Sequence, residues 1–415
     1  MESNNNIRTE YKSYINQVEQ MDIFKIINEI VQNKLESNDD DAFFLLNIDD
    51  LVMKYIVWIS KMPRVKPYYA VKCNDNEIVL KTLAELGTGF DCASKGELEM
   101  VLKIGVESDR IIYANPTKQI SHLQFAKEMK VEKMTCDSVS ELYKIKSIYP
   151  NAKVVLRIRF DAEDALLSLG AKFGCDPVEA PQLIELCKTL KLDLIGFSFH
   201  VGSGCKNFEI YKQALYVVRE LFNFASTIGF LLNFVDIGGG FLGNNISLMD
   251  KYAKSINQAI QEYFPDPSVI IISEPGRYFV SSAFTLVTNI HSKKTLLESS
   301  GEISSISYYI NDGLFASFLG RYLDGNLNEC TYKTLKNNEH ITKHYKSTLW
   351  GATCDSVDKI AEQIMLPELS IGDWLVTENM GDYTVSILTK FNGYKSRNIY
   401  PITTSFTLHQ SPHLD

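Results

Sequence analysis

The chain has 415 residues, 45% of them hydrophobic and 22% charged, which is enough apolar material for a large buried core. Its 51 acidic and 42 basic residues leave a formal charge of −9, and this balance argues against nucleic-acid binding. No apolar run reaches the roughly 20 residues of a membrane span, the N-terminus lacks a signal-peptide core, and the eight cysteines form no C-x-x-C pair. We therefore expect a cytoplasmic protein with no membrane span, disulfide framework or metal site.

Eight short apolar or β-branched runs alternate with longer segments of helical character between about residue 66 and residue 277. The intervening segments, such as 94–104 and 138–148, place apolar residues three and four positions apart. This alternation is typical of parallel strands with helical crossovers, and eight units favour a closed (β/α)8 TIM-like barrel. The expected strands are 67–71, 88–92, 110–115, 133–137, 153–159, 194–202, 234–240 and 269–277.

The pattern changes after about residue 280, where short β-rich stretches follow one another with turns between them. They indicate a C-terminal antiparallel β domain, in which only 358–363 is long and periodic enough for a short helix. The apolar run 43–48 precedes the first barrel strand, so we expect it to lead into a barrel covering 43–280. The expected strands of the second domain, 281–410, are 282–290, 305–312, 344–351, 373–380 and 383–391.

Polar residues or glycines stand at the end of every expected barrel strand. In a (β/α)8 barrel these carboxyl ends form the active-site face, so the side chains should converge on one ligand. A single polar residue can simply mark the end of a strand, but a set that mixes cations, carboxylates and a histidine favours a site. The set is Lys72, Asp91, Asn115, Asp137, Arg157 or Arg159, His200, glycines 238–240, Glu274 and Arg277.

Two of these strand ends have a specific chemistry. Lys72 ends an apolar strand, where partial desolvation would lower its pKa and free the amine to form a Schiff base with an aldehyde. The glycines at 238–240 would let backbone N–H groups approach an anion, and no nucleotide P-loop pattern is present. A solvated lysine and a flexible turn are the plainer interpretations of each motif alone.

Two further motifs complete the pattern. A buried Glu274 could keep a pyridine nitrogen protonated, although a local ion pair with Arg277 is the simpler alternative. His200 could stack on a flat ring, and Ser203 could donate to a phosphate. Lysine, glutamate, glycine loop and histidine together describe a site for pyridoxal 5′-phosphate (PLP).

The same motifs identify a known family. The chain closely resembles the eukaryotic ornithine decarboxylase family, which belongs to the alanine-racemase-like, fold-III PLP-dependent decarboxylases, and the resemblance runs from about residue 20 to 400. It implies a β domain that also includes N-terminal residues, about 20–42. The segments that carry the resemblance are 67–74, 89–97, 199–205, 236–241, 274–280, 350–358 and 378–385.

The resemblance implies a role for each matching residue. Lys72 is implied to be the Schiff-base lysine, Glu274 to pair with the pyridinium nitrogen and His200 to stack on the ring. The other implied cofactor-binding residues are Asp91, Arg157, Ser203, Gly239, Gly240, Pro275, Gly276, Arg277 and Tyr383.

Family members are homodimers with shared active sites, which implies that the partner chain supplies Cys354 as proton donor. Asp355 and Asp324 would bind the distal ammonium of the substrate, because a buried unpaired charge costs several kcal/mol. Leu323 and Phe391 are implied to line the substrate site, and Lys172 and Asp358 to form an ion pair between subunits.

The implied activity is decarboxylation of L-ornithine to putrescine and CO2 by a PLP-dependent carboxy-lyase, the first step of polyamine biosynthesis. Two alternatives stay open: a decarboxylase for lysine, arginine or diaminopimelate, and an inactive regulator that resembles antizyme inhibitors. Antizyme itself is a possible partner. Phe315 and Leu323 depart from the family pattern, which has tyrosine at both positions.

Overall fold

The computed structural model describes residues 22–160, 170–205, 207–243, 247–335 and 343–404. It divides into two compact units. The barrel unit is Lys54–Phe279, and the β unit combines residues up to Met53 with those from Val280 onward. None of the described helices is long and apolar enough to span a membrane.

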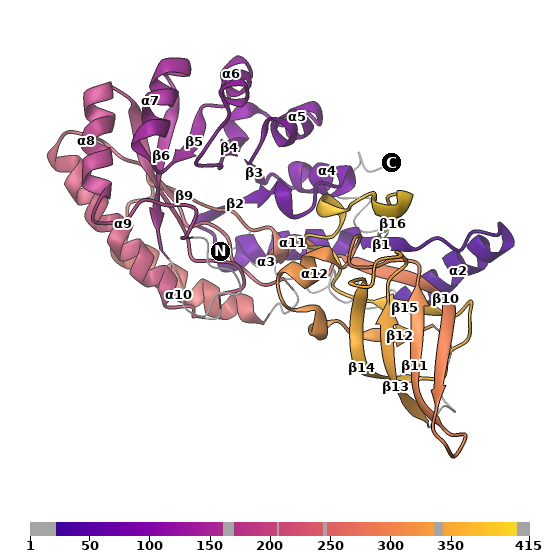
Figure 1. Cartoon of the computed structure of the whole chain (residues 1–415). Helices are drawn as coiled ribbons and strands as arrows, with labels where there is room; N and C mark the ends of the chain where they lie inside the picture. Colours follow the sequence, from indigo (N-terminus) through magenta and orange to yellow (C-terminus); the bar gives the residue numbers. More distant parts are fainter. Residues whose placement is uncertain (1–21, 161–169, 206, 244–246, 336–342, 405–415) are drawn as a thin grey trace. The chain divides into compact units, whose positions relative to one another are not determined.

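The barrel unit contains a closed barrel of parallel strands in sequential order, β2 to β9 (Figure 1). Each expected barrel strand is present, which confirms the (β/α)8 prediction. The strands are β2 (Val65–Ala70), β3 (Gly89–Cys92), β4 (Ile111–Tyr113), β5 (Lys133–Cys136), β6 (Lys153–Arg159), β7 (Asp193–His200), β8 (Phe234–Asp236) and β9 (Ile270–Ser273).

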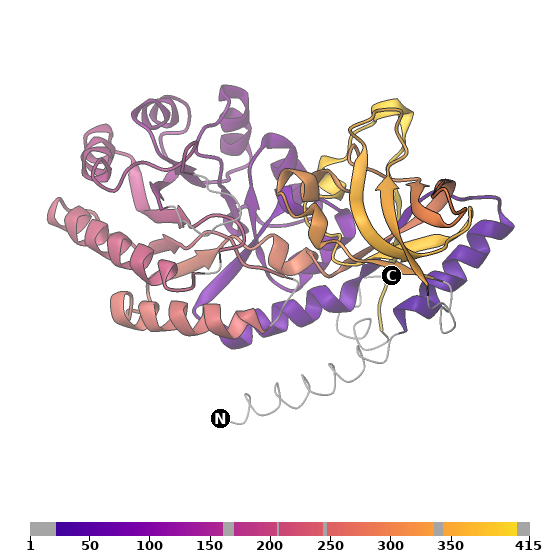
Figure 2. The ribbon, with the colours of Figure 1, turned by 60° about the horizontal axis from the view of Figure 1, so that its bottom comes forward.

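The crossover helices lie outside the strands, and Figure 2 shows several of them nearly end-on. Their first turns follow from local sequence: Ser94 Oγ caps α5 by accepting the N–H of Glu97 at 3.2 Å. The helices are α4 (Glu77–Glu85), α5 (Lys95–Lys103), α6 (Ile120–Glu128), α7 (Val139–Ile148), α8 (Ala180–Leu190), α9 (Ile210–Thr227) and α10 (Leu248–Tyr263), with the 3₁₀ turns η1 (Val71–Cys73) and η2 (Ser108–Arg110). Two helices, α3 (Ile48–Lys61) and α11 (Arg277–Val280), cross the boundaries between the units.

A layer of apolar side chains fills the barrel below its carboxyl-end rim. Its members come from five different strands and are almost fully buried, so the interior is a packed core rather than a channel. These residues are Tyr68, Ile112, Val155, Phe234 and Ile272.

The β unit contains a sheet in the order β12-β15-β10-β11-β13-β14, with β1 paired to both β10 and β16. Most pairs are antiparallel, while β1 with β16 and β11 with β13 are parallel. The elements are α2 (Ile23–Glu36), β1 (Phe43–Asn47), β10 (Phe284–Leu297), β11 (Ile303–Ile310), α12 (Leu319–Leu323), η3 (Leu327–Glu329), β12 (Tyr332–Thr334), β13 (His344–Trp350), β14 (Lys359–Pro367), β15 (Trp374–Thr377), η4 (Val385–Ile387), η5 (Phe391–Gly393) and β16 (Asn398–Ile402).

Three predictions need correction. Residues 43–48 do not lead a barrel that begins at residue 43, because β1 pairs with β10 and β16 of the β unit. Residues 358–363 are not a helix, since β14 pairs antiparallel with the preceding strand β13. Residues 383–391 are not a strand, because Tyr383 has a φ of +51° and the 3₁₀ turn η4 follows.

A buried ion pair organises the loop that follows β11. Arg397 Nε donates to Asp312 Oδ2 at 2.8 Å, and the two side chains are only 7% and 0% exposed. Asp312 also accepts the backbone N–H of Ser317 at 2.9 Å and its hydroxyl at 2.7 Å. Removing this carboxylate would leave a buried guanidinium without its counter-charge.

Asp312→Ala should therefore lower the free energy of unfolding by about 3–5 kcal/mol, the usual cost of breaking a buried pair. Glu368→Ala is the matched control, because Glu368 pairs with Lys293 while 51% exposed and should cost less than about 1 kcal/mol. Chemical denaturation of both variants measures the difference. Equal losses in the two variants would contradict the prediction.

Candidate active site

The candidate site lies at the carboxyl-end rim of the barrel. Because the strands are parallel and closed, side chains that follow their carboxyl ends meet at one face. Lys72 stands in the turn η1 after β2, Asp91 lies in β3, His200 ends β7 and Glu274 follows β9. The barrel unit therefore brings together residues that are far apart in the sequence.

Lys72 and Asp91 form an ion pair at this rim. Lys72 Nζ contacts Asp91 Oδ2, and Asp91 is fully buried. Asp91 Oδ1 has no hydrogen-bond partner among the described residues. The lysine side chain is 41% exposed, so it is only partly shielded from water. The pair holds the amine over a buried carboxylate at the mouth of the barrel.

Three successive glycines form a backbone cradle beside this pair. A Cβ on Gly238 would lie 2.2 Å from the carbonyl oxygen of Phe199, and one on Gly240 would lie 2.4 Å from that of Gly202. Gly238 and Gly240 also have positive φ angles of +65° and +101°. Only glycine fits these positions, and the bare backbone can approach a ligand closely.

His200 faces the cradle as a neutral imidazole. Its Nδ1 accepts the N–H of Gly202 at 3.0 Å, so the remaining ring proton resides on Nε2. Burial, reinforced by the positive charges of Arg157 and Lys72, lowers the pKa of His200 well below its usual value. A Cβ on Gly239 would lie 3.0 Å from His200 Nε2, so the ring borders the cradle directly.

A cation completes the cradle. Arg277 is 7% exposed at the start of α11, and its Nε donates to Ser203 Oγ at 2.9 Å. Gly276, just before it, packs so tightly that a Cβ would lie 2.8 Å from the Cβ of Cys73, beside Lys72. Pro275 contributes a carbonyl that accepts the N–H of Ala70 at 3.3 Å. A guanidinium next to bare backbone is an arrangement suited to an anion such as phosphate.

Glu274 carries an unsatisfied carboxyl oxygen. Burial raises the pKa of Glu274 well above its usual value, and the negative charges of Asp236 and Asp91 raise it further. Its Oε1 has no hydrogen-bond partner among the described residues. A ligand with a protonated ring nitrogen would satisfy this oxygen and neutralise the charge.

Two acidic residues received no role from the sequence. Asp236, at the end of β8, is fully buried and lies within hydrogen-bonding reach of Glu274. Glu97 accepts the N–H of Ala93 at 2.6 Å, and burial raises the pKa of Glu97 to about 7. Both residues lie in segments that carry the family resemblance. The sequence signal that could have identified them is their position: Asp236 lies just before the glycines, and Glu97 lies three residues after the Ser94 cap.

Three further basic residues of the barrel unit contact an aromatic ring or a carboxylate. The Arg157 guanidinium lies 5.2 Å from the ring centre of Phe173. Lys172 is exposed, with its ammonium 5.1 Å from the same ring. Arg159 pairs with Asp176 at 2.5 Å.

In the β unit, Cys354 and Asp355 lie in one turn between β13 and β14. All eight cysteines are free, and Cys354 is the exposed one. Its N–H donates to Asn392 Oδ1 at 3.1 Å, while Asp355 Oδ1 accepts the N–H of Val357 at 2.8 Å. Asp358 is buried, and its carboxylate accepts the N–H of Leu314 and the hydroxyl of Thr353, both at 2.7 Å.

The other expected residues of the β unit lie on nearby turns. Phe391 packs on Phe315 with ring centres 4.7 Å apart. Leu323 ends the short helix α12 and is 62% exposed, and Asp324 is its C-cap. Tyr383 packs its backbone against Gly320, where a Cβ would lie 2.1 Å from the Tyr383 carbonyl oxygen.

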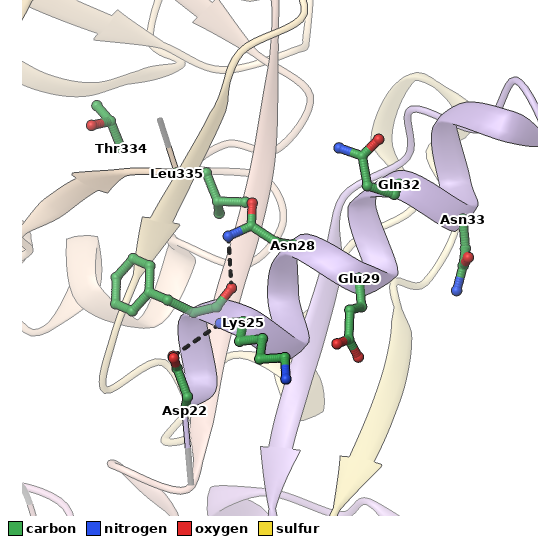
Figure 3. A pocket seen from close by; sticks show the side chains of 9 residues that line it. Asp22, Lys25, Asn28, Glu29, Gln32, Asn33, Thr334 and Leu335 are labelled. Atoms are coloured by element: carbon green, nitrogen blue, oxygen red, sulfur yellow. Dashed lines mark hydrogen bonds between the residues drawn. The ribbon is translucent and has the colours of Figure 1, made fainter. Parts of the chain in front are cut away.

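Figure 3 shows another pocket, against α2 of the β unit. Polar and charged side chains make up most of its lining, and Asn28 Nδ2 donates to the Phe24 carbonyl at 2.9 Å. None of the residues expected at the active site is among the described residues that line it.

The rim lysine, the unsatisfied Glu274 oxygen and the glycine cradle beside Arg277 match the aldehyde, ring nitrogen and phosphate of PLP. They define a PLP-binding barrel of the alanine-racemase-like class. Residues 48–281 match the family described as pyridoxal-dependent decarboxylase, pyridoxal binding domain, and the chain belongs to this family. Its cofactor is PLP.

Known relatives agree with this assignment. Mouse ornithine decarboxylase is 43% identical over 90% of this chain and 83% of its own length. Antizyme inhibitor 2 of Xenopus laevis is also 43% identical, over 90% of this chain and 84% of its own. The curated decarboxylases at this identity show that the chain is a PLP-dependent decarboxylase.

Solved structures share the whole architecture. The arginine decarboxylase of Paramecium bursaria Chlorella virus, bound to agmatine, has a TM-score of 0.87 and 36% identity, covering 92% of this chain and all of its own. The lysine/ornithine decarboxylase of Vibrio vulnificus, complexed with putrescine, has a TM-score of 0.79 and 30% identity, covering 91% and 98%.

Gly240→Ala should weaken PLP binding by about tenfold or more, because its Cβ would displace the Gly202 carbonyl and distort the cradle. Gly105→Ala is the matched control: Gly105 also has a positive φ, of +89°, but no atom lies within 4 Å of an added Cβ. PLP titration followed by fluorescence quenching measures the dissociation constants. Similar losses of PLP affinity in both variants would contradict the role of the glycine cradle in PLP binding.

Proposed function

We propose that the protein decarboxylates L-ornithine to putrescine and CO2, the first step of polyamine biosynthesis. The choice of ornithine rests on one observation: the residues that match the family's ammonium-binding pair are both aspartates, Asp324 and Asp355. The 43% identity to mouse ornithine decarboxylase supports the same substrate.

The barrel residues hold and tune the cofactor. When bound, PLP supplies an electron sink that stabilises the charge left on Cα as CO2 departs. The Lys72 amine anchors the aldehyde, the Glu274 carboxylate accepts the ring N–H, and the neutral His200 stacks on the ring. Asp91 and Arg157 belong to the polar surroundings of the ring. The phosphate is held by Ser203, Gly239, Gly240, Gly276, Arg277 and Tyr383, next to Pro275.

The β-unit residues act on the substrate. The Cys354 thiol returns a proton to Cα, a role supported by its exposure in a turn that Asn392 fixes. Asp324 and Asp355 bind the distal ammonium, and Leu323 and Phe391 form the apolar wall along its methylene chain. Phe315 supports that wall by packing on Phe391.

The active enzyme is a homodimer in which Cys354 and Asp355 serve the partner's barrel. Lys172 and Asp358 form an ion pair between subunits; Asp358 already accepts hydrogen bonds within its own unit, so this pair would add to a buried network. The dimer acts in the cytoplasm, with antizyme as a possible binding partner.

Two other functions have specific support. The likeness to the viral arginine decarboxylase and to the lysine/ornithine decarboxylase supports a different basic substrate. The identity to antizyme inhibitor 2 supports a regulator without catalysis. Every barrel residue that the family uses for PLP is present, which favours an enzyme over a regulator.

Decarboxylation of ornithine, lysine and arginine should be compared by kcat/KM from CO2 release. The kcat/KM for ornithine should be the highest, and that for lysine, which is one methylene longer, should be lower by about 10–200-fold. A higher kcat/KM on lysine or arginine would replace the proposed substrate. A PLP-loaded protein with no turnover on any of them would indicate the regulator.

Mixing inactive variants tests the shared site. Lys72→Ala and Cys354→Ala should each abolish or strongly reduce turnover alone. Co-expressed, they should recover about a quarter of native activity, because half of a random dimer population carries one intact composite site. Size-exclusion chromatography confirms that both variants dimerise. Dimers that form without any recovery would show that Cys354 acts within its own chain.

A further inference from the structure

A second carboxyl lies directly behind the one that faces the pyridine nitrogen. Asp236 ends β8 and is 0% exposed. Its Oδ1 accepts the N–H of Gly238 at 2.9 Å, and the Gly238 carbonyl accepts the N–H of Glu274 at 2.8 Å. A single glycine residue therefore positions both Asp236 and Glu274.

The two carboxyls are close enough to require a shared proton. Asp236 and Glu274 lie within hydrogen-bonding reach of one another. Asp236 Oδ2 and Glu274 Oε1 receive no N–H or O–H from the described residues. Two ionised carboxylates in contact at a buried site repel strongly, so one of them holds a proton. In the PLP-free chain this proton resides on Glu274, because the hydrogen bond between the two raises the pKa of Glu274 and lowers that of Asp236.

The register of the barrel places this pair in a polar layer. Asp236 lies opposite Ser198 on β7, and Ser198 lies opposite Arg157 on β6. The Ser198 and Thr135 hydroxyls in the barrel have no hydrogen-bond partner among the described residues. The charged or titratable groups around the pair are Asp91, Arg157, Lys72, His200 and Tyr68.

We propose that Asp236 is a positioning residue that takes the shared proton from Glu274 when PLP binds and then donates a hydrogen bond to Glu274. The Glu274 carboxylate is then held ionised and oriented toward the pyridine nitrogen of PLP. This inference rests on the role proposed for Glu274, and it adds a second acid that works through the first.

Asparagine imitates this state of Asp236. Its carbonyl can accept the Gly238 N–H, and its amide can donate to Glu274 as the protonated acid does. Leucine has a similar size but offers neither group, which leaves the Gly238 N–H and the Glu274 carboxylate without partners.

The first experiment measures the PLP dissociation constant by fluorescence quenching. Asp236→Asn should stay within about threefold of the native value, whereas Asp236→Leu should lose about tenfold or more. A loss of more than tenfold in Asp236→Asn would show that an ionised Asp236 is needed, and would overturn the proposal. Native affinity in Asp236→Leu would overturn it as well.

The second experiment does not depend on the cofactor. Burial raises the pKa of Asp236 from 3.8 to about 7, so its protonated form stabilises the folded PLP-free chain. That stabilisation is complete below about pH 4 and is lost as the pH rises through 7. Urea unfolding of the PLP-free protein should show stability falling between about pH 4 and pH 7, with a smaller fall in Asp236→Asn.

Asp193→Asn is the matched control, because Asp193 is an exposed carboxylate at the opposite end of β7. Its pH dependence should equal that of the native chain. An unchanged slope in Asp236→Asn would contradict the shared proton, and this measurement remains decisive if Asp236→Leu does not fold.

Glu274→Gln distinguishes the role proposed for Glu274 from the role proposed for Asp236. If this change leaves PLP affinity unaltered, the role proposed for Glu274 is wrong. If it weakens PLP while Asp236→Leu does not, Glu274 acts on the ring without help and only the role of Asp236 fails.

Discussion

Closure of the barrel between its first and last strands is the constraint on which the site depends. Val65 and Pro67 of β2 lie opposite Ile271 and Ser273 of β9. Just beyond this seam, the N–H of Ala70 donates to the Pro275 carbonyl at 3.3 Å. The rim lysine, which follows Ala70, therefore comes to lie beside the glutamate, which precedes Pro275. Lys72 and Glu274 are far apart in the sequence, and only the closed ring of parallel strands brings them together.

The electrostatics of the rim follow from this placement. Three carboxyls, Asp91, Asp236 and Glu274, are gathered where water has limited access, and such a cluster is unstable unless protons or cations compensate it. Lys72 compensates Asp91 directly, and a shared proton relieves the other two. A cationic pyridine ring would also compensate this cluster, because it would place a positive charge next to Glu274. The neutral His200, whose Nδ1 is occupied by a backbone N–H, adds no charge to the rim.

In the β unit, the predicted site residues lie on backbone turns, whereas those of the barrel unit lie at strand ends. Buried carboxylates of Asp358 and Asp312 accept N–H and O–H groups from the turns around them. These turns hold Cys354 and Phe391 at exposed positions. A rigid, hydrogen-bonded support below exposed groups is what a composite site would need from the chain that lends them.

The prediction of the barrel succeeded because its signals are local. Each strand is a short apolar run and each crossover an amphipathic segment, so periodicity alone separates them, as in 153–159 and 139–148. The errors fell where pairing between strands decides. The run Phe43–Asn47 reads like any buried strand, and only its pairing with β10 and β16 assigns it to the β unit. Lys359–Pro367 is extended because β13 lies beside it.

The sequence by itself determined the class of fold and the PLP cofactor, and it predicted the lysine, glutamate and glycine loop of the site. These depend on residue types at fixed spacing along single strands and turns. Only the tertiary structure revealed that Asp236 stands behind Glu274, that burial raises the pKa of Glu97 to about 7 and that Lys72 keeps contact with water. Burial and charge coupling are properties of neighbours in space. The chain brings those neighbours together only when the barrel closes.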